Sequence, residues 1–357
     1  MIQKTKILPD TSDNLKNLND ISILITCFNK ISYIEACFKN LEPYKNFIKE
    51  IIIIDDGSTD GSTSLIKKIS TENSHIKFFS TNNQGSAAAR NLALTKATKE
   101  FVLFLDMDDR LFLDNIYIGL DLLKNSNCIA AMYNYVEKPS GWIGRTIHDL
   151  KVPDVKNLKD VRNELMQNLG YWRYLYRKSA IIDYQIKFLP SFADLKGSYF
   201  ILDDIFWLIY FFSIDAKIVC LPPENVIYEY QTEGLKDSST RKRYLNQIIL
   251  FPNAVAVFLN YLQLNKNDTD YEWAKDKAYQ LMWGNFRYLG IWEFTKTFNG
   301  LLKLHKFKNS YNIFNKSYAR NLLQTLYLTL RNSLSRILIL RTLWLKSGII
   351  FRNSINN

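Results

Sequence analysis

The chain has few of the residues that build zinc sites and disulfide frameworks. Its 357 residues include four cysteines and three histidines. The cysteines show no paired spacing, so we expect reduced thiols in the cytoplasm. No two histidines lie close together along the chain, which argues against a zinc site or histidine-based catalysis. No internal repeat or low-complexity tract occurs, and the polar stretch that follows Met1 predicts no cleavable signal sequence.

Acidic residues are absent from the C-terminal part of the chain. Residues 294–357 contain eleven Lys and Arg and no Asp or Glu, so this segment carries a charge of +11. The whole chain also sums to +11, from 46 basic and 35 acidic residues, which leaves residues 1–293 neutral. No recognised nucleic-acid motif accompanies the charge, so nucleic acid is not an expected partner.

Long uncharged apolar runs are also missing from this basic segment. Cations interrupt it at Arg331, Arg336, Arg341 and Lys346, so no run reaches the ~18 residues that a membrane-spanning helix requires. On a helical wheel most cations fall on one arc, opposite the Leu, Ile and Trp residues, and Arg336 breaks the pattern. The pattern is typical of an interfacial helix on anionic lipid, here at the inner face of the cytoplasmic membrane. A helical subdomain that packs on the protein or on a second copy explains it equally well.

The rest of the sequence alternates between strand and helix patterns. Short apolar runs typical of buried strands occur at residues 21–26, 51–54, 76–79 and 101–105. Ser32 and Glu35 have the spacing of a capping box at the start of the first intervening helix. This alternation predicts an α/β fold with a parallel sheet and right-handed crossovers, so several strand ends meet at one edge.

Carboxylates follow the strand at residues 101–105. Asp106, Asp108 and Asp109 come directly after it, and Asp106 and Asp108 share one side of an extended chain. Open α/β sheets bind ligands outside the carboxyl ends of their strands. Paired carboxylates there suit Mg²⁺ or Mn²⁺ that bridges a diphosphate. A strand that ends in an acidic turn explains the same residues without a metal.

Four motifs in order along the chain resemble those of glycosyltransferase family 2, the inverting, nucleotide-sugar-dependent enzymes with a GT-A fold. They lie at residues 22–29, 54–60, 83–91 and 105–109. The close resemblance covers roughly residues 20–125, and a looser one continues to about residue 235. It implies a GT-A, Rossmann-like mixed sheet that is mainly parallel and flanked by helices, followed by the basic helical C-terminal region.

The resemblance assigns the nucleotide base to three residues. Thr26, Phe28 and Asp56 match positions that hold it. An aromatic face can stack on a pyrimidine, and a carboxylate can accept a hydrogen bond from the N3–H of uracil, which cytosine lacks. Uridine diphosphate is therefore the expected carrier.

The resemblance also assigns the groups near the diphosphate. Arg90 matches a cation close to the nucleotide, where a guanidinium suits charge-assisted contacts. Asp108 matches the direct metal ligand, and Asp106 matches the carboxylate near the ribose, the donor sugar and the metal. Asp109 fits equally well as a turn residue beside Arg110 or as a support for the metal ligands.

Inverting transfer needs a base that removes the proton of the acceptor hydroxyl. Residues 201–208 place Asp203 and Asp204 at the head of an apolar helix, where the family usually has Glu-Asp with the second acid as base. On that match Asp204 is the base and Asp203 is a departure. Capping of the helix N-terminus is the structural alternative. The helix end lowers the pKa of Asp204 and a nearby carboxylate raises it, and the sequence leaves that balance open.

Two further segments bear on the acceptor side. Residues 170–179 resemble the family's aromatic-basic strand before the acceptor helix, although an ordinary half-buried strand fits equally. After the strand at residues 226–231 many relatives carry Arg or His on a loop that closes over the diphosphate. Glu229 and Gln231 stand at those places, and the nearest cations along the chain are Lys236, Arg241, Lys242 and Arg243.

We expect a catalytic domain over residues 1–239, with a nucleotide-binding half at 20–125 and an acceptor half at 126–239. A helical region over 240–357 follows, basic and amphipathic from about 294, through which a homo-oligomer could form. The expected function is a metal-dependent inverting hexosyl- or N-acetylhexosaminyltransferase. It would move sugar from a UDP-sugar to a hydroxyl of a glycan or lipid-linked glycan, in a capsule, lipooligosaccharide or teichoic-acid type of surface polymer.

Two alternatives remain from the sequence. One is a sugar transferase that acts on a lipid phosphate. The other is a non-catalytic glycan-binding or assembly protein of the same fold. The presence together of Asp56, Asp106, Asp108 and Asp204 argues against the second alternative.

Overall fold

A computed structural model describes residues 16–144, 150–189, 203–231, 251–266 and 269–286. The chain divides into two units, Met1–Asp237 with Tyr261–Ala274, and Ser238–Asn260 with Lys275–Asn357. The boundary expected between residues 239 and 240 stays a prediction. The basic segment 294–357 and the cations from Lys236 to Arg243 lie outside the described residues, so the expectations for them also stay predictions.

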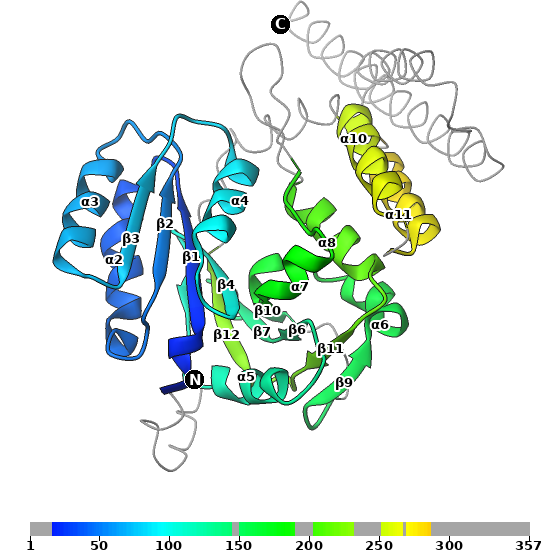
Figure 1. The fold of residues 1–357 in the computed structure, drawn as a ribbon, viewed down its shortest axis with the longest axis horizontal. Helices are drawn as coiled ribbons and strands as arrows, with labels where there is room; N and C mark the ends of the chain where they lie inside the picture. The colour runs from blue at the N-terminus through cyan, green and yellow to red at the C-terminus, as the bar shows by residue number, and fades with distance from the viewer. Residues whose placement is uncertain (1–15, 145–149, 190–202, 232–250, 267–268, 287–357) are drawn as a thin grey trace, which may run out of the picture. The chain divides into compact units, whose positions relative to one another are not determined.

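The main sheet of the first unit has eight strands in the order β3-β2-β1-β4-β10-β6-β11-β9 (Figure 1). Strands β1 to β4 pair in parallel, β10 runs antiparallel between β4 and β6, and β11 pairs in parallel with β6. The sheet is therefore mixed, as predicted. In chain order its strands are β1 (Ile21–Cys27), β2 (Ile51–Asp55), β3 (Ile76–Ser80), β4 (Phe101–Asp106), β6 (Ala130–Met132), β9 (Asp154–Asn157), β10 (Tyr174–Arg177) and β11 (Lys217–Cys220).

A second sheet of four strands begins immediately after the acidic turn that ends β4. Its order is β5-β12-β7-β8, with bounds Arg110–Leu111, Val226–Gln231, Asn134–Lys138 and Ile143–Gly144. In the pairing of β5 with β12, Tyr228 lies opposite Leu111 and Glu229 lies opposite Arg110. The pairing brings β12 next to the carboxylates at residues 106–109, which the sequence places more than a hundred residues earlier.

Helices connect the strands. Right-handed crossovers place α2 and α3 on one face of the parallel strands and α4 on the other, because the chain reverses its direction across the sheet after β3. Two further helices, α10 and α11, lie within residues 240–293. The helices are α2 (Ile31–Leu41), α3 (Ser62–Glu72), α4 (Ser86–Lys96), α5 (Ile116–Lys124), α6 (Leu158–Leu165), α7 (Lys178–Asp183), α8 (Asp203–Ser213), α10 (Phe251–Leu264) and α11 (Tyr271–Phe286).

The start of α2 differs from the sequence expectation. The helix begins at Ile31, so Ser32 lies inside it and the predicted capping box is wrong. The side chain of Asp60 instead accepts a hydrogen bond from the backbone N–H of Ile31 at 2.9 Å. Because this acceptor comes from the loop between β2 and α3, the local pattern around Ser32 could not reveal it.

An aromatic cluster in the core fixes α8 against the main sheet. The ring of Phe104 on β4 meets four other rings edge-on, at centroid distances of 5.3 to 6.0 Å. Trp207 of α8 also stacks on Phe188 at 4.1 Å. Each such pair adds about 0.5–1.5 kcal/mol beyond the burial of apolar area. The cluster consists of Phe104, Tyr171, Tyr176, Phe188 and Trp207, and it determines where the head of α8 lies.

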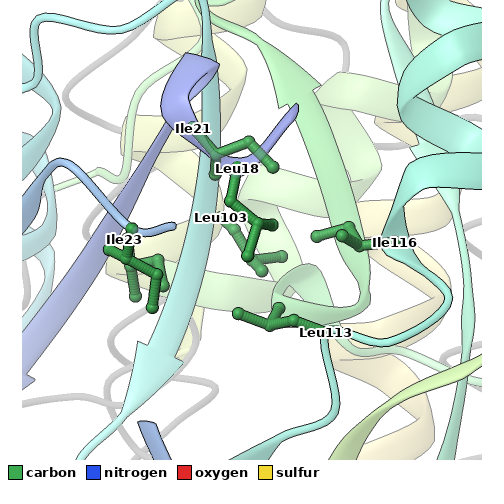
Figure 2. Close-up of a pocket in the computed structure, with 7 residues that line it drawn as sticks. Leu18, Ile21, Ile23, Leu103, Leu113 and Ile116 are labelled. Carbon is green, nitrogen blue, oxygen red and sulfur yellow. The ribbon is translucent and has the colours of Figure 1, made fainter. Parts of the chain in front are cut away.

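An apolar pocket near the amino end of β1 is lined by aliphatic side chains alone, so it offers no group for a nucleotide or a metal (Figure 2). The lining residues are Leu18, Ile21, Ile23, Ile48, Leu103, Leu113 and Ile116.

Across the described ranges, no helix has the length and apolarity to cross a bilayer. All four cysteines are buried free thiols, as expected.

Candidate active site

The candidate site lies where the order of the sheet reverses. Strand β1 runs between β2 and β4, and Thr26 near its carboxyl end pairs in register with Ile54 of β2 and Asp106 of β4. Adjacent parallel strands whose connections lead in opposite directions leave a crevice at their carboxyl ends, and open α/β sheets bind ligands there. The structure therefore brings Thr26 and Asp106 side by side at the predicted edge.

Phe28 and Asp56 differ in how much of each side chain a ligand can reach. Phe28, just beyond β1, is 44% exposed, whereas Asp56 is 4% exposed. The Asp56 carboxylate accepts hydrogen bonds from the backbone N–H groups of Gln84 at 2.9 Å and Gly85 at 2.7 Å. It also accepts one from the hydroxyl of Thr81 at 3.1 Å. A carboxylate has about four lone-pair sites, so one acceptor position is left for the predicted contact with uracil.

The turn that Asp56 holds depends on a glycine. Gly57 has a φ of +79°, and a Cβ there would lie 2.8 Å from the backbone nitrogen of Asn83. No other residue fits both the left-handed backbone and this close approach. The close approach lets the loop after β3 pass beside Asp56 to Gly85, which precedes the first residue of α4, and Arg90 lies about one turn further along that helix.

Arg90 joins three parts of the site. Its guanidinium donates to Asp203 on α8 at 2.7 Å and to Asp106 on β4 at 3.4 Å. It also lies over the ring of Tyr171, 4.6 Å from the centroid. Burial lowers the pKa of Arg90, whereas Tyr171, Asp203 and Asp106 raise it by a larger amount. The pKa of Arg90 therefore lies well above its usual value. The sequence predicted a cation here, but not that the cation would bind Asp203.

Two tyrosines at the site were missed by the sequence analysis. Tyr171 donates its hydroxyl hydrogen bond to Asp106 at 2.9 Å. The hydroxyl of Tyr228 accepts from the backbone N–H of Asp106 at 3.2 Å and donates to Asp109 at 2.7 Å. Tyr171 lies in the aromatic-basic segment that resembles the family, which was the only signal pointing to it. Tyr228 had no signal, because its contact depends on the second sheet.

Asp106 and Asp108 are the two carboxylates that open toward solvent. Their side chains are 27% and 32% exposed. Mg²⁺ usually binds one or two carboxylates and completes its shell with water and substrate phosphates. Within the described residues no group of three or more His, Cys, Asp or Glu could hold a metal. The two carboxylates therefore fit a divalent cation that a diphosphate helps to bind, rather than one held by protein groups alone.

A lysine contacts the predicted metal ligand. The ammonium of Lys30 lies 2.5 Å from Asp108 Oδ2. Burial lowers the pKa of Lys30, while the hydrogen bond and the charge of Asp108 raise it above its usual value. The sequence analysis did not single out Lys30, which follows directly after the motif at residues 22–29.

Asp109 points away from the open carboxylates. It is 3% exposed and accepts from Tyr228 and from the backbone N–H of Gln231 at 2.8 Å. Burial, and then the charge of Asp106, raise its pKa to about 8. Of the two roles left open by the sequence, these contacts favour support: Asp109 holds the end of β12 beside the metal-ligand turn.

Asp203 and Asp204 have different surroundings although they are adjacent. Helix α8 begins at Asp203, as predicted. Asp203 is 4% exposed, and its Oδ2 atom accepts from Arg90 and from the hydroxyl of Ser86 at 3.2 Å. Asp204 is half-buried, and its carboxylate accepts from the backbone N–H of Ile205 at 2.8 Å. Burial, and then the charge of Asp203, raise the pKa of Asp204 to about 7, so these effects outweigh Arg90 and the hydrogen bond from Ile205, which lower it.

Glu229 and Gln231, which stand where the resemblance leads us to expect a cation, lie on β12. Glu229 is 6% exposed, accepts from the side-chain amide of Gln231 at 2.7 Å and lies 3.6 Å from the guanidinium of Arg110. Glu229 is thus an internal part of the second sheet. At these two positions the structure thus has side chains that bond to each other and no cation.

Known proteins resemble the chain in sequence and in fold. Residues 22–184 match the sequence model of Glycosyl transferase family 2. An uncharacterized glycosyltransferase of Rickettsia conorii is 39% identical over 122 residues, 33% of this chain and 20% of that protein. The poly-beta-1,6-N-acetyl-D-glucosamine synthase of Staphylococcus aureus is 34% identical over 175 residues, 48% of this chain and 42% of that protein. The chain thus spans less than half the length of these curated relatives.

The solved structure of S. aureus TarS in complex with UDP-GlcNAc has the same fold. It aligns with a TM-score of 0.52 at 16% identity, over 86% of this chain and 79% of that chain. The main sheet and its flanking helices are therefore the GT-A fold that glycosyltransferases use. Residues 22–184 therefore form a glycosyl transferase family 2 domain.

Proposed function

We propose that the chain is a metal-dependent inverting glycosyltransferase that moves a hexose or N-acetylhexosamine from a UDP-sugar to a hydroxyl of a surface glycan. The observation that carries this proposal is the convergence of separate elements on one sheet edge. Two open carboxylates follow β4, Arg90 contacts one of them, and Arg90 also holds the head of α8, where Asp204 lies. This edge of the sheet therefore offers groups that could bind a donor and a metal, and a carboxylate that could accept a proton.

The donor half of the proposal rests on the end of β1 and the turn after β2. Phe28 offers an exposed ring for stacking on a pyrimidine, and Asp56 keeps one acceptor position beside Thr26 on the neighbouring strand. The TarS complex contains UDP-GlcNAc in the same fold. Both observations favour a uridine carrier.

The diphosphate would lie between β1 and β4. Asp108 and Asp106 would hold Mn²⁺ or Mg²⁺, which supplies positive charge to the departing diphosphate. Arg90 keeps Asp106 in place through its guanidinium, and Tyr171 does so through its hydroxyl. These contacts fix the carboxylate of Asp106, whereas the carboxylate of Asp108 contacts Lys30.

Asp204 would act as the base. The acceptor oxygen forms a bond to the anomeric carbon as the bond from that carbon to the diphosphate breaks, and the proton of the acceptor hydroxyl passes to the Asp204 carboxylate. Attack opposite the leaving group inverts the anomeric configuration. A pKa of about 7 suits this role, because a base works best when its pKa is near the operating pH. Asp203 is a positioning residue, since it holds Arg90 and raises the pKa of Asp204.

The pH dependence of transfer follows from this assignment. The base must be ionised, so kcat/KM is expected to rise as the pH increases through about 7. Asp203→Asn removes a negative charge that raises the pKa of Asp204, so the midpoint should move to lower pH. Asp215→Asn, in an exposed pair with Lys159, should leave the midpoint in place. Pre-steady-state transfer measured across pH checks this, and an unmoved midpoint in Asp203→Asn would show that Asp203 does not act on the base.

The proposal also includes an acceptor and a location. The synthase of S. aureus named above is a polysaccharide enzyme by its name, which supports a glycan acceptor of the cell surface. A cytoplasmic protein bound at the inner face of the membrane would meet such an acceptor when it is lipid-linked. The basic segment 294–357 would supply that attachment through anionic lipid.

A panel of nucleotide sugars tests the proposed reaction. With Mn²⁺ present, at least one UDP-sugar should raise the melting temperature of the purified chain and release UDP slowly. Chelation of the metal should remove both effects. If only GDP- or CMP-sugars act, the uridine carrier is wrong, and if no nucleotide sugar acts, the transferase proposal fails.

A further inference from the structure

The proposed reaction assigns no role to the ion pair between Lys30 and Asp108. Among the described ion pairs, Lys30 is the cation that contacts Asp108, while Arg90 contacts Asp106 and Arg110 contacts Glu229. Both partners are about one-third exposed, at 35% and 32%, so solutes can reach both side chains. A divalent cation that binds Asp108 Oδ2 must displace the ammonium from that oxygen.

The backbone around Lys30 is held firmly. The N–H of Asn29 donates to the hydroxyl of Ser58 at 2.8 Å, and the N–H of Lys30 donates to the hydroxyl of Ser62 at 3.2 Å. The N–H of Ile31 is capped by Asp60. Ser58 and Asp60 belong to the loop between β2 and α3, and Ser62 is the first residue of α3. The lysine can therefore move only through its four-carbon side chain, from a fixed position at the donor edge.

Strand β12 contains no Lys, Arg or His, and its Glu229 and Gln231 bond to each other. The diphosphate gains negative charge as it departs, while the metal ion that binds it also binds carboxylates, so a further cation would help to stabilise it. Lys30 follows β1, which pairs with β4 in the main sheet, whereas β12 belongs to the second sheet.

We propose that Lys30 is an exchangeable counter-ion of the donor site: it neutralises Asp108 in the free enzyme and turns to the donor diphosphate when Asp108 binds metal. This inference rests on the proposed function. It assigns Lys30 two opposite effects. Lys30 competes with the metal when no nucleotide is present, and it strengthens binding of the nucleotide when the metal is present. A lysine that only stabilised the loop would have neither effect.

Binding titrations separate these effects without any measurement of transfer. In the first titration, electron paramagnetic resonance measures free Mn²⁺ in the presence of the protein alone. In the second titration, UDP is added to the protein at saturating Mn²⁺. Lys30→Met should bind Mn²⁺ about tenfold more tightly without nucleotide, a change of about 1.4 kcal/mol, since the ammonium no longer competes for Asp108 Oδ2. The same variant should bind UDP about tenfold more weakly with Mn²⁺ present, because a charge-assisted contact is lost. Lys30→Arg keeps the charge and should stay near the wild type in the first titration.

Lys124→Met is the matched control. Lys124 forms an ion pair of the same length with Asp20, and its side chain is 30% exposed, but it lies on α5. This variant should leave both titrations unchanged. If Lys30→Met binds Mn²⁺ no more tightly, or UDP no more weakly, than the wild type, the exchange is refuted while the transferase proposal stands. If the wild type itself binds no UDP with Mn²⁺, both proposals fall.

Discussion

Asp108→Asn is expected to abolish sugar transfer and to weaken Mn²⁺-dependent binding of UDP, while the fold survives. The side chain is about one-third exposed and forms no buried contact that an amide of equal size would break. The amide oxygen is uncharged, so it binds a divalent cation far less well than a carboxylate does. The change also leaves Lys30 without its acidic partner, but a part-exposed pair contributes little to stability.

Isothermal titration of UDP at fixed Mn²⁺ measures this effect directly. Asp114→Asn is a suitable control, because Asp114 lies beyond β5 and accepts a hydrogen bond from Tyr44 at 2.7 Å. That variant should bind UDP as the wild type does. Unchanged metal-dependent affinity in Asp108→Asn would remove Asp108 from the metal site.

Asp204→Asn is expected to have the second largest effect, with a different signature. Binding of UDP and Mn²⁺ should stay nearly intact, since Asp204 bonds to the backbone of its own helix and not to the carboxylates of β4. Transfer should fall by roughly 10²–10⁴-fold, the range of general-base contributions. The amide cannot accept the acceptor proton, and it retains the size and the capping position of the carboxyl group.

Single-turnover transfer and UDP titration on the same preparation separate the two signatures. Asp203→Asn should lose less activity than Asp204→Asn, because Asp203 acts through Arg90 and through the pKa of its neighbour. A larger loss in Asp203→Asn, with substantial turnover in Asp204→Asn, would assign the base to Asp203 instead.

The central part of the fold could be predicted because it depends on local pattern. Apolar runs predicted β1 to β4 to within a residue or two, and strand-helix alternation predicted their parallel pairing. The start of α2 could not be predicted in the same way. Its cap, Asp60, comes from another loop, and the capping box at Ser32 was a local pattern that the tertiary structure overrode.

In the candidate site, too, the features that depend on local sequence could be predicted, and the contacts between distant segments could not. Residues that follow a strand directly, such as Asp106 and Asp108, were placed correctly at the sheet edge from the sequence. Contacts between distant segments were not foreseen: Tyr171 with Asp106, Lys30 with Asp108, and Arg90 with Asp203. Each of these joins residues whose proximity depends on β10, α8 or the loop after β1, and spacing along the chain carries no information about it. The pKa of Asp204 was open for the same reason, since burial decides its direction.

A crystal structure of the chain with UDP and Mn²⁺, with the metal located by anomalous scattering, tests the account most directly. We predict Mn²⁺ on Asp108, with Asp106 beside it, uracil against Phe28 and Asp56, and the ammonium of Lys30 turned to the diphosphate. Mn²⁺ bound away from Asp108, or UDP bound anywhere other than the carboxyl ends of β1 and β4, would contradict it.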